Sequence, residues 1–164
     1  MPHDLEKYSR MFATVLLILV ATLSVAHAED DDEGWPQQAV SNDKWVTECT
    51  ACHVAYPPRF LPAESWRAIM SGLDKHFGSN AGLDAESANE ITAFLVKNAD
   101  TRAHPVLGKP LLRLTETSWF KSDHREVAAH VWKNIKIRSP ANCGACHPKA
   151  DRGDFSEDDV KIPK

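Results

Sequence analysis

Two copies of one five-residue pattern use all four cysteines of the chain, at residues 49–53 (CTACH) and 143–147 (CGACH). The pattern C-x-x-C-H is typical of covalent c-type haem attachment. Two thiols separated by two residues can reach the two vinyl groups on one porphyrin edge, and the adjacent histidine can bind iron through a neutral ring nitrogen. The sequence therefore predicts two covalently bound haem c groups, attached at Cys49, Cys52, Cys143 and Cys146, with His53 and His147 as proximal iron ligands.

Three other roles are open to paired cysteines. They could hold a structural zinc ion, form a redox-active dithiol or form structural disulfides. None of these roles requires a histidine directly after the second cysteine, yet both copies have one. Haem attachment is therefore the favoured interpretation, and the chain is predicted to be a dihaem cytochrome.

The N-terminal region has the pattern of an export signal. Residues 11–26 carry no charge and are mostly apolar, and residues 26–28 (AHA) form a small-x-small cleavage site. We expect residues 1–28 to be a cleaved signal peptide, because the apolar run is short for the roughly 30 Å hydrocarbon core of a bilayer. Asp4 and Glu6 offset the basic residues Lys7 and Arg10, so an uncleaved N-terminal anchor is the alternative.

Removal of the first 28 of 164 residues leaves 136, enough for one domain or two very small ones. The formal net charge is −4, and no basic stripe appears, so nucleic acid is not an expected partner. Residues 29–33 (EDDDE) are interpreted as a solvated acidic leader, with a docking patch for a basic partner as the alternative.

The mature chain is predicted to be mainly α, with helices over residues 37–47, 63–77, 85–98 and 123–136. Asp84 is a candidate N-cap, Gly78 a helix stop, and Asp123 with Glu126 a capping box. Clustered prolines predict a loop over residues 56–62, and residues 99–121 are expected to be an irregular linker. A domain boundary near residue 100 would separate an N-terminal haem domain (29–100) from a C-terminal one (101–164).

A second ligand, opposite the motif histidine, decides whether a haem iron is closed or keeps an open coordination position. The candidates in the mature chain are His76, His104, His124, His130 and Met70. For the first haem we favour His76, because it lies at the edge of a predicted apolar helix face, whereas Met70 is more typical of a core filler. His104, beside a proline in the predicted linker, is disfavoured.

For the second haem, the predicted helix 123–136 places His124 on the same side as Val131 and Ile135, and His130 about 120° away. We therefore favour His124 over His130, although crossed ligation between the two haems stays open. Trp119 and Phe120 could form a porphyrin wall, or could be ordinary core residues.

The chain resembles the bacterial dihaem cytochromes c over nearly all of its mature region. The resemblance rests on an ordered set of segments. These are both C-x-x-C-H motifs, the stretch 61–78, residues 115–117 with Trp119, Phe120 and His124, and the closing Ala150, Gly153 and Phe155. It implies an N-terminal domain similar to class I cytochromes c, a less regular C-terminal haem domain, and two bis-histidine haems. It also implies a periplasmic shuttle between a membrane b-type cytochrome and a small oxygen-binding monohaem cytochrome.

We therefore expect a monomeric, low-potential electron carrier without a catalytic residue. The alternative is a peroxidase-like enzyme or a ligand-binding haem protein, which would need one open coordination position on an iron.

Overall fold

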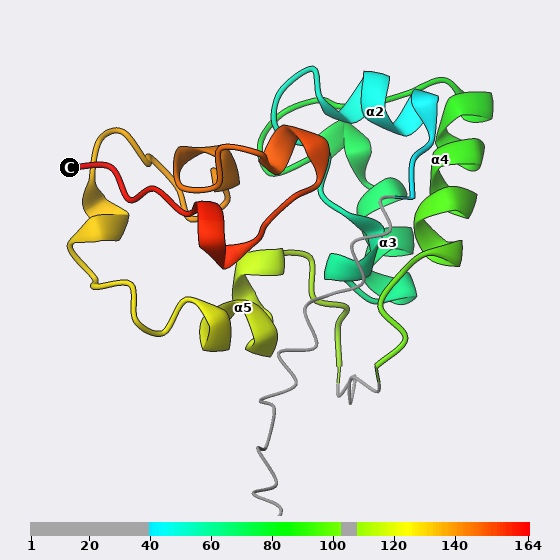
Figure 1. Ribbon diagram of the computed structural model, residues 1–164. Helices are drawn as coiled ribbons and strands as arrows, with labels where there is room; N and C mark the ends of the chain where they lie inside the picture. Colours follow the sequence, from blue (N-terminus) through cyan, green and yellow to red (C-terminus); the bar gives the residue numbers. More distant parts are fainter. Residues whose placement is uncertain (1–39, 103–107) are drawn as a thin grey trace, which may run out of the picture. The chain divides into compact units, whose positions relative to one another are not determined.

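The computed structural model describes residues 40–102 and 108–164, which belong to one compact unit that spans Gln37–Lys164. Regular structure in these ranges is helical, in α2 (Asp43–Cys49), α3 (Ala63–Met70), α4 (Ala85–Lys97) and α5 (Ser118–Asp123), joined by short 3-10 turns (Figure 1). The prediction of a mainly α fold is confirmed. The predicted signal peptide and acidic leader lie outside the described residues.

Within the described ranges, no helix has both the length and the apolar content needed to cross a bilayer.

Helix α4 forms as its sequence predicts. The Asp84 carboxylate accepts a hydrogen bond from the Ser87 backbone N–H at 3.0 Å and caps the helix. Ile91 and Leu95 are fully buried against α3, which lies beside α4 in Figure 1. Burial of two such side chains contributes about 3–6 kcal/mol, so this pair is a main stabilising element of the fold.

Helix α2 begins at Asp43, later than the predicted start at residue 37, and residues 40–42 are not helical. Asn42 explains the difference, because its side chain accepts a hydrogen bond from the Trp45 N–H at 2.8 Å and so acts as N-cap. Lys44 then forms ion pairs with Glu86 and Glu90 of α4, at 3.3 and 2.8 Å. The helix is thereby fixed across α4, and its last residue is the first cysteine of a C-x-x-C-H motif.

The predicted helix over residues 63–77 is wrong beyond Met70, where α3 ends. The Ser71 hydroxyl bonds to the Ala68 carbonyl at 2.9 Å, and Gly72 favours leaving the helix. A 3-10 turn, Leu73–Lys75, follows, and the chain then reverses through Phe77 (φ 48°) and Gly78 (φ 97°). As a result His76 has extended backbone outside any helix.

The predicted helix over residues 123–136 is also wrong. Helix α5 ends where it was expected to begin, and its N-cap is Thr117, whose hydroxyl accepts from the Phe120 N–H at 3.2 Å. The expected irregular linker therefore contains α5 and a 3-10 turn, Leu114–Glu116. Beyond it, β-branched residues disfavour a helix, and the Asn134 side chain bonds the Lys136 N–H at 2.9 Å to form a local turn.

One hydrophobic cluster contains residues from both sides of position 100. Its buried members are Trp45, Leu61, Trp66, Ile91, Leu95, Leu114 and Phe120. The Trp119 indole N–H also donates to the Phe60 carbonyl at 3.1 Å, which ties α5 to the first half of the chain. The predicted domain boundary near residue 100 stays a prediction.

Candidate haem sites

The first C-x-x-C-H motif lies at the end of α2. Cys49 is the last helical residue and packs against the hydrophobic cluster, whereas Cys52 and His53 are exposed in the turn that follows. Burial raises the pKa of the Cys49 thiol to about 11. The buried thiol is therefore a poor nucleophile for a redox-active dithiol, whereas a neutral thioether suits the same apolar environment.

The second motif is a single 3-10 turn, Cys143–Ala145, followed by Cys146 and His147. Side chains three residues apart lie on the same side of such a turn, so both thiols can face one porphyrin edge. The His147 N–H donates to the Cys143 carbonyl at 2.8 Å and holds the histidine against the turn. Burial also raises the pKa of the Cys143 thiol to about 11.

Each motif histidine faces a second histidine from a distant part of the chain. The ring centroids of His53 and His76 are 6.2 Å apart, and those of His124 and His147 are also 6.2 Å apart. A histidine nitrogen binds a first-row metal at about 2 Å, and the ring centroid lies roughly 1 Å further away, so two axial imidazoles have centroids about 6 Å apart. Both pairs therefore fit one iron between two rings.

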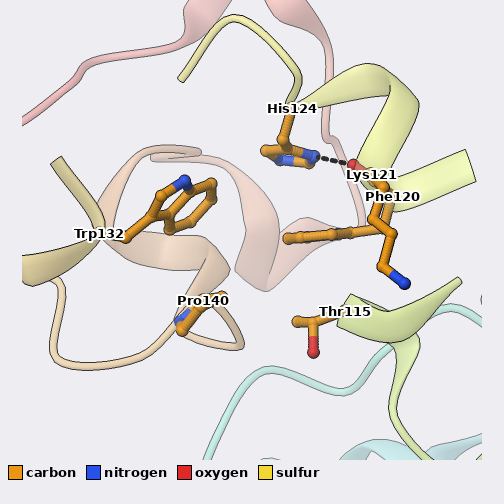
Figure 2. A pocket seen from close by; sticks show the side chains of 6 residues that line it. All are labelled: Thr115, Phe120, Lys121, His124, Trp132 and Pro140. Carbon is orange, nitrogen blue, oxygen red and sulfur yellow. Dashed lines mark hydrogen bonds between the residues drawn. The ribbon is translucent and has the colours of Figure 1, made fainter. Parts of the chain in front are cut away.

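Two of the four rings are oriented by backbone carbonyls. Nδ1 of His53 donates to the Val54 carbonyl at 2.7 Å, and Nδ1 of His124 donates to the Phe120 carbonyl at 2.9 Å (Figure 2). Each bond fixes the tautomer in which Nε2 carries the free lone pair, the form that a metal ligand requires.

Burial acts on the other two rings. It lowers the pKa of His76 and, together with the neighbouring His124, lowers the pKa of His147, so the neutral imidazole is favoured at both. Nδ1 of His147 is buried and has no hydrogen-bond partner within the described part of the chain. Its ring is instead packed beside Phe155, with centroids 5.8 Å apart.

A cavity of about 300 Å³ opens beside His124 (Figure 2). Its walls are mostly apolar, and Lys121 and Thr115 add polar groups at one side; the lining residues are Thr115, Phe120, Lys121, His124, Trp132 and Pro140. The Phe120 ring stacks on His124 with centroids 4.1 Å apart. Apolar walls with a few polar groups at one side are typical of a pocket that binds a small molecule or a cofactor.

The remaining candidates lie elsewhere or outside the described residues. Met70 packs against the hydrophobic cluster, as expected of a core filler, and His130 is exposed. His104 lies outside the described residues. Trp119 packs on Phe60, with centroids 5.0 Å apart, and does not line the cavity, so only Phe120 of the proposed porphyrin wall does.

Sequence reasoning missed two neighbours of the sites. Tyr56 stacks on His53 with ring centroids 4.7 Å apart, and Trp132 lines the cavity beside His124. The three-residue spacing between His53 and Tyr56 was the available signal for the first, whereas nothing local marked Trp132. Burial raises the pKa of Tyr56 to about 12, so its hydroxyl remains a donor.

The other interpretations of the cysteines gain no support. Among the described residues the four cysteines form no disulfide, and no group of three or more His, Cys, Asp or Glu side chains could hold a metal ion. A structural zinc site needs four such ligands. The donor set is instead two thiols and two facing imidazoles at each site, which defines a c-type cytochrome with two haem sites.

Comparisons with known proteins agree with this class. Residues 45–155 match the family described as dihaem cytochrome c. Two solved structures, of DHC and of diheme cytochrome c from Rhodobacter sphaeroides, are each 43% identical and cover 70% of this chain and 96% of their own, with TM-scores of 0.61 and 0.62. A diheme cytochrome c from Shewanella baltica OS155 is 37% identical and covers 74% of this chain and 93% of its own, with a TM-score of 0.65. No curated protein matches the sequence.

The chain belongs to the dihaem cytochrome c family. It is a haem-based electron carrier with two covalently bound haem c groups.

Proposed function

We propose that the protein is a periplasmic electron shuttle whose two haem irons are each closed by two histidines. His53 and His76 would hold the first iron, and His124 and His147 the second. The observation that carries this proposal is the equal 6.2 Å separation of the two ring pairs, each of which contains one motif histidine. Among the ring contacts of the described residues, no similar pair joins His53 to His124 or His76 to His147, so uncrossed ligation is favoured.

The chain supplies three things to such a centre. Neutral imidazoles on both sides leave no position for a substrate, and carbonyl contacts at His53 and His124 keep the rings oriented. Phe120, Trp132 and Pro140 give the second site an apolar lining. When bound, the haem iron supplies one-electron transfer, and a pair of histidines gives it a lower reduction potential than histidine with methionine.

The proposed setting follows from the N-terminal signal pattern. A cleaved signal would deliver the chain to an oxidising compartment, where c-type haem is attached. The family resemblance suggests a membrane b-type cytochrome and a small oxygen-binding monohaem cytochrome as the two redox partners, with the shuttle working as a monomer and forming no covalent bond with a substrate.

Removal of single histidines tests the ligand assignment. His76→Ala and His124→Ala should each convert one haem to high spin and open it to carbon monoxide, while the other haem stays low-spin. The matched control is His130→Ala, which should leave both haems low-spin. His76→Met should keep six-coordination and raise the potential of the first haem.

Two outcomes would contradict the assignment. One is that both alanine variants remain fully low-spin. The other is that His130→Ala, and not His124→Ala, opens the second haem. Rapid carbon monoxide binding by the unaltered reduced protein would instead favour the peroxidase-like or ligand-binding alternative.

A further inference from the structure

The Tyr56 side chain contacts a histidine of the first haem site and the segment that leads into the second motif. Its ring stacks on His53, with centroids 4.7 Å apart and planes at 18°. Its hydroxyl donates a 2.6 Å hydrogen bond to the carbonyl of Ala141, which is 85 residues further along the chain. Tyr56 therefore connects a predicted ligand of the first iron to the segment that leads into the second motif.

The acceptor carbonyl lies directly beside the second attachment site. Ala141 precedes Cys143 by two residues, and its oxygen is 3.7 Å from the Cys143 sulfur. The order of contacts is thus the His53 ring, the Tyr56 ring, the Tyr56 hydroxyl, the Ala141 carbonyl and the Cys143 sulfur. The path from the His53 ring to the Cys143 sulfur therefore consists of covalent bonds, one ring stack, one short hydrogen bond and one sulfur contact.

We infer that Tyr56 is the bridge through which the two haem centres exchange electrons. This inference rests on the proposed function, because it requires His53 to be an iron ligand. In the exchange, one iron passes from ferrous to ferric as the other passes from ferric to ferrous. No bond forms or breaks, and the phenol keeps its proton and is not itself oxidised.

A rival route runs through aromatic rings. Phe60 lies 5.0 Å from Phe155, and Phe155 lies 5.8 Å from His147, measured between ring centroids. Each step on this route crosses a gap between side chains. Electronic coupling decays faster across such gaps than through covalent and hydrogen bonds. The tyrosine route also crosses two gaps, at the ring stack and at the sulfur contact, but covalent bonds and a 2.6 Å hydrogen bond join them, so it is the stronger route.

The experiment uses the mature holoprotein and variants that separate the contacts. Tyr56→Phe keeps the ring stack and removes the hydrogen bond, whereas Tyr56→Leu removes both. Trp119→Phe removes a different hydrogen bond that joins the two halves of the chain, and Phe155→Leu breaks the rival route. A laser-generated flavin semiquinone injects one electron, and absorbance follows its redistribution between the haems.

We expect the interhaem rate, at matched driving force, to fall several-fold in Tyr56→Phe and further in Tyr56→Leu. The rate should change little in Trp119→Phe and Phe155→Leu. Potentiometric titration of each variant supplies the driving force and is a readout independent of the rate. An unchanged rate in Tyr56→Phe would overturn the inference, as would an equal loss in Trp119→Phe or a larger loss in Phe155→Leu.

Failure of the proposed function is recognisable separately. If the unaltered protein has a haem that is high-spin when oxidised, the bis-histidine assignment fails whatever the rates. If both haems are low-spin in all variants and the rates are equal, only the role of Tyr56 fails. Should Tyr56→Leu not mature, Tyr56→Phe still decides, because it differs from tyrosine by one oxygen atom.

Discussion

The imidazole planes of His124 and His147 meet at 69°, whereas those of His53 and His76 meet at 27°. The two sites therefore have the same ring spacing but different ring orientation. Two iron d orbitals can interact with the imidazole rings. Nearly parallel imidazoles interact with the same one of these orbitals and so separate the two in energy, whereas nearly perpendicular imidazoles interact with both orbitals alike. Two haems with the same pair of ligand types should thus be electronically different.

Electron paramagnetic resonance of the oxidised protein should resolve this difference. We expect two low-spin signals, of which the one from the second haem has the larger maximal g value. His76→Ala should remove the signal with the smaller maximal g value and leave the other in place. A single set of g values for both haems would show that the two ring orientations are not retained in the holoprotein.

The buried side chain of Ile91 should contribute far more to the free energy of unfolding than the exposed side chain of Ile135. Ile91 of α4 is completely buried against α3, so Ile91→Ala should lower the free energy of unfolding by about 2–5 kcal/mol. Ile135 is 83% exposed, and Ile135→Ala should change the free energy of unfolding by less than about 0.5 kcal/mol. Urea unfolding of the two holoproteins, followed by circular dichroism, makes the comparison. Similar losses in both variants would mean that the hydrophobic cluster is misassigned.

The Asp84 cap should make α4 sensitive to acid. Hydrogen bonds from the Ser87 backbone and side chain lower the pKa of Asp84 in the folded protein. A lowered folded pKa means that the cap stabilises the protein above the unfolded pKa of the carboxyl, and that this contribution is lost as the pH falls through the folded pKa. Thermal unfolding between neutral and acidic pH should show this loss.

Two variants separate the charge of Asp84 from its capping role. Asp84→Asn can still cap the helix but cannot titrate, so it should lose this part of the pH dependence and remain stable at neutral pH. Asp84→Ala should unfold at a lower temperature than the unaltered protein at neutral pH, and this difference in unfolding temperature should be smaller at acidic pH. If the alanine variant unfolds at the same temperature as the unaltered protein at every pH, the cap contributes nothing.

The sequence predicted local features well where one residue decides the structure. Asp84 begins α4 as predicted, and Ile91 and Leu95 form its buried face. These features depend on contacts within a few residues, so they can be inferred without knowledge of the rest of the fold.

The errors arose where side chains compete for the backbone. Periodic apolar residues predicted one helix to residue 77, but Ser71 and Gly72 end it and leave His76 free to face His53. His124 was favoured by its phase on a helix that does not form. It nevertheless faces His147, because the C-terminal end of α5 and the Phe120 carbonyl position its ring.

The contacts between distant segments could not be predicted. The hydrogen bond from Tyr56 to Ala141 joins residues 85 positions apart, and no local pattern marks it. The same holds for Trp132 beside His124. These contacts depend on how the two halves of the chain pack around their shared hydrophobic cluster.

Carbon monoxide titration of the reduced, mature protein, with the attached haems counted by mass, decides whether both irons are closed. We expect two haems, each bound through two thioether links, and no rapid carbon monoxide binding, because a histidine would lie on each side of each iron. A colourless protein with four free thiols, or rapid binding at either haem, would contradict this expectation.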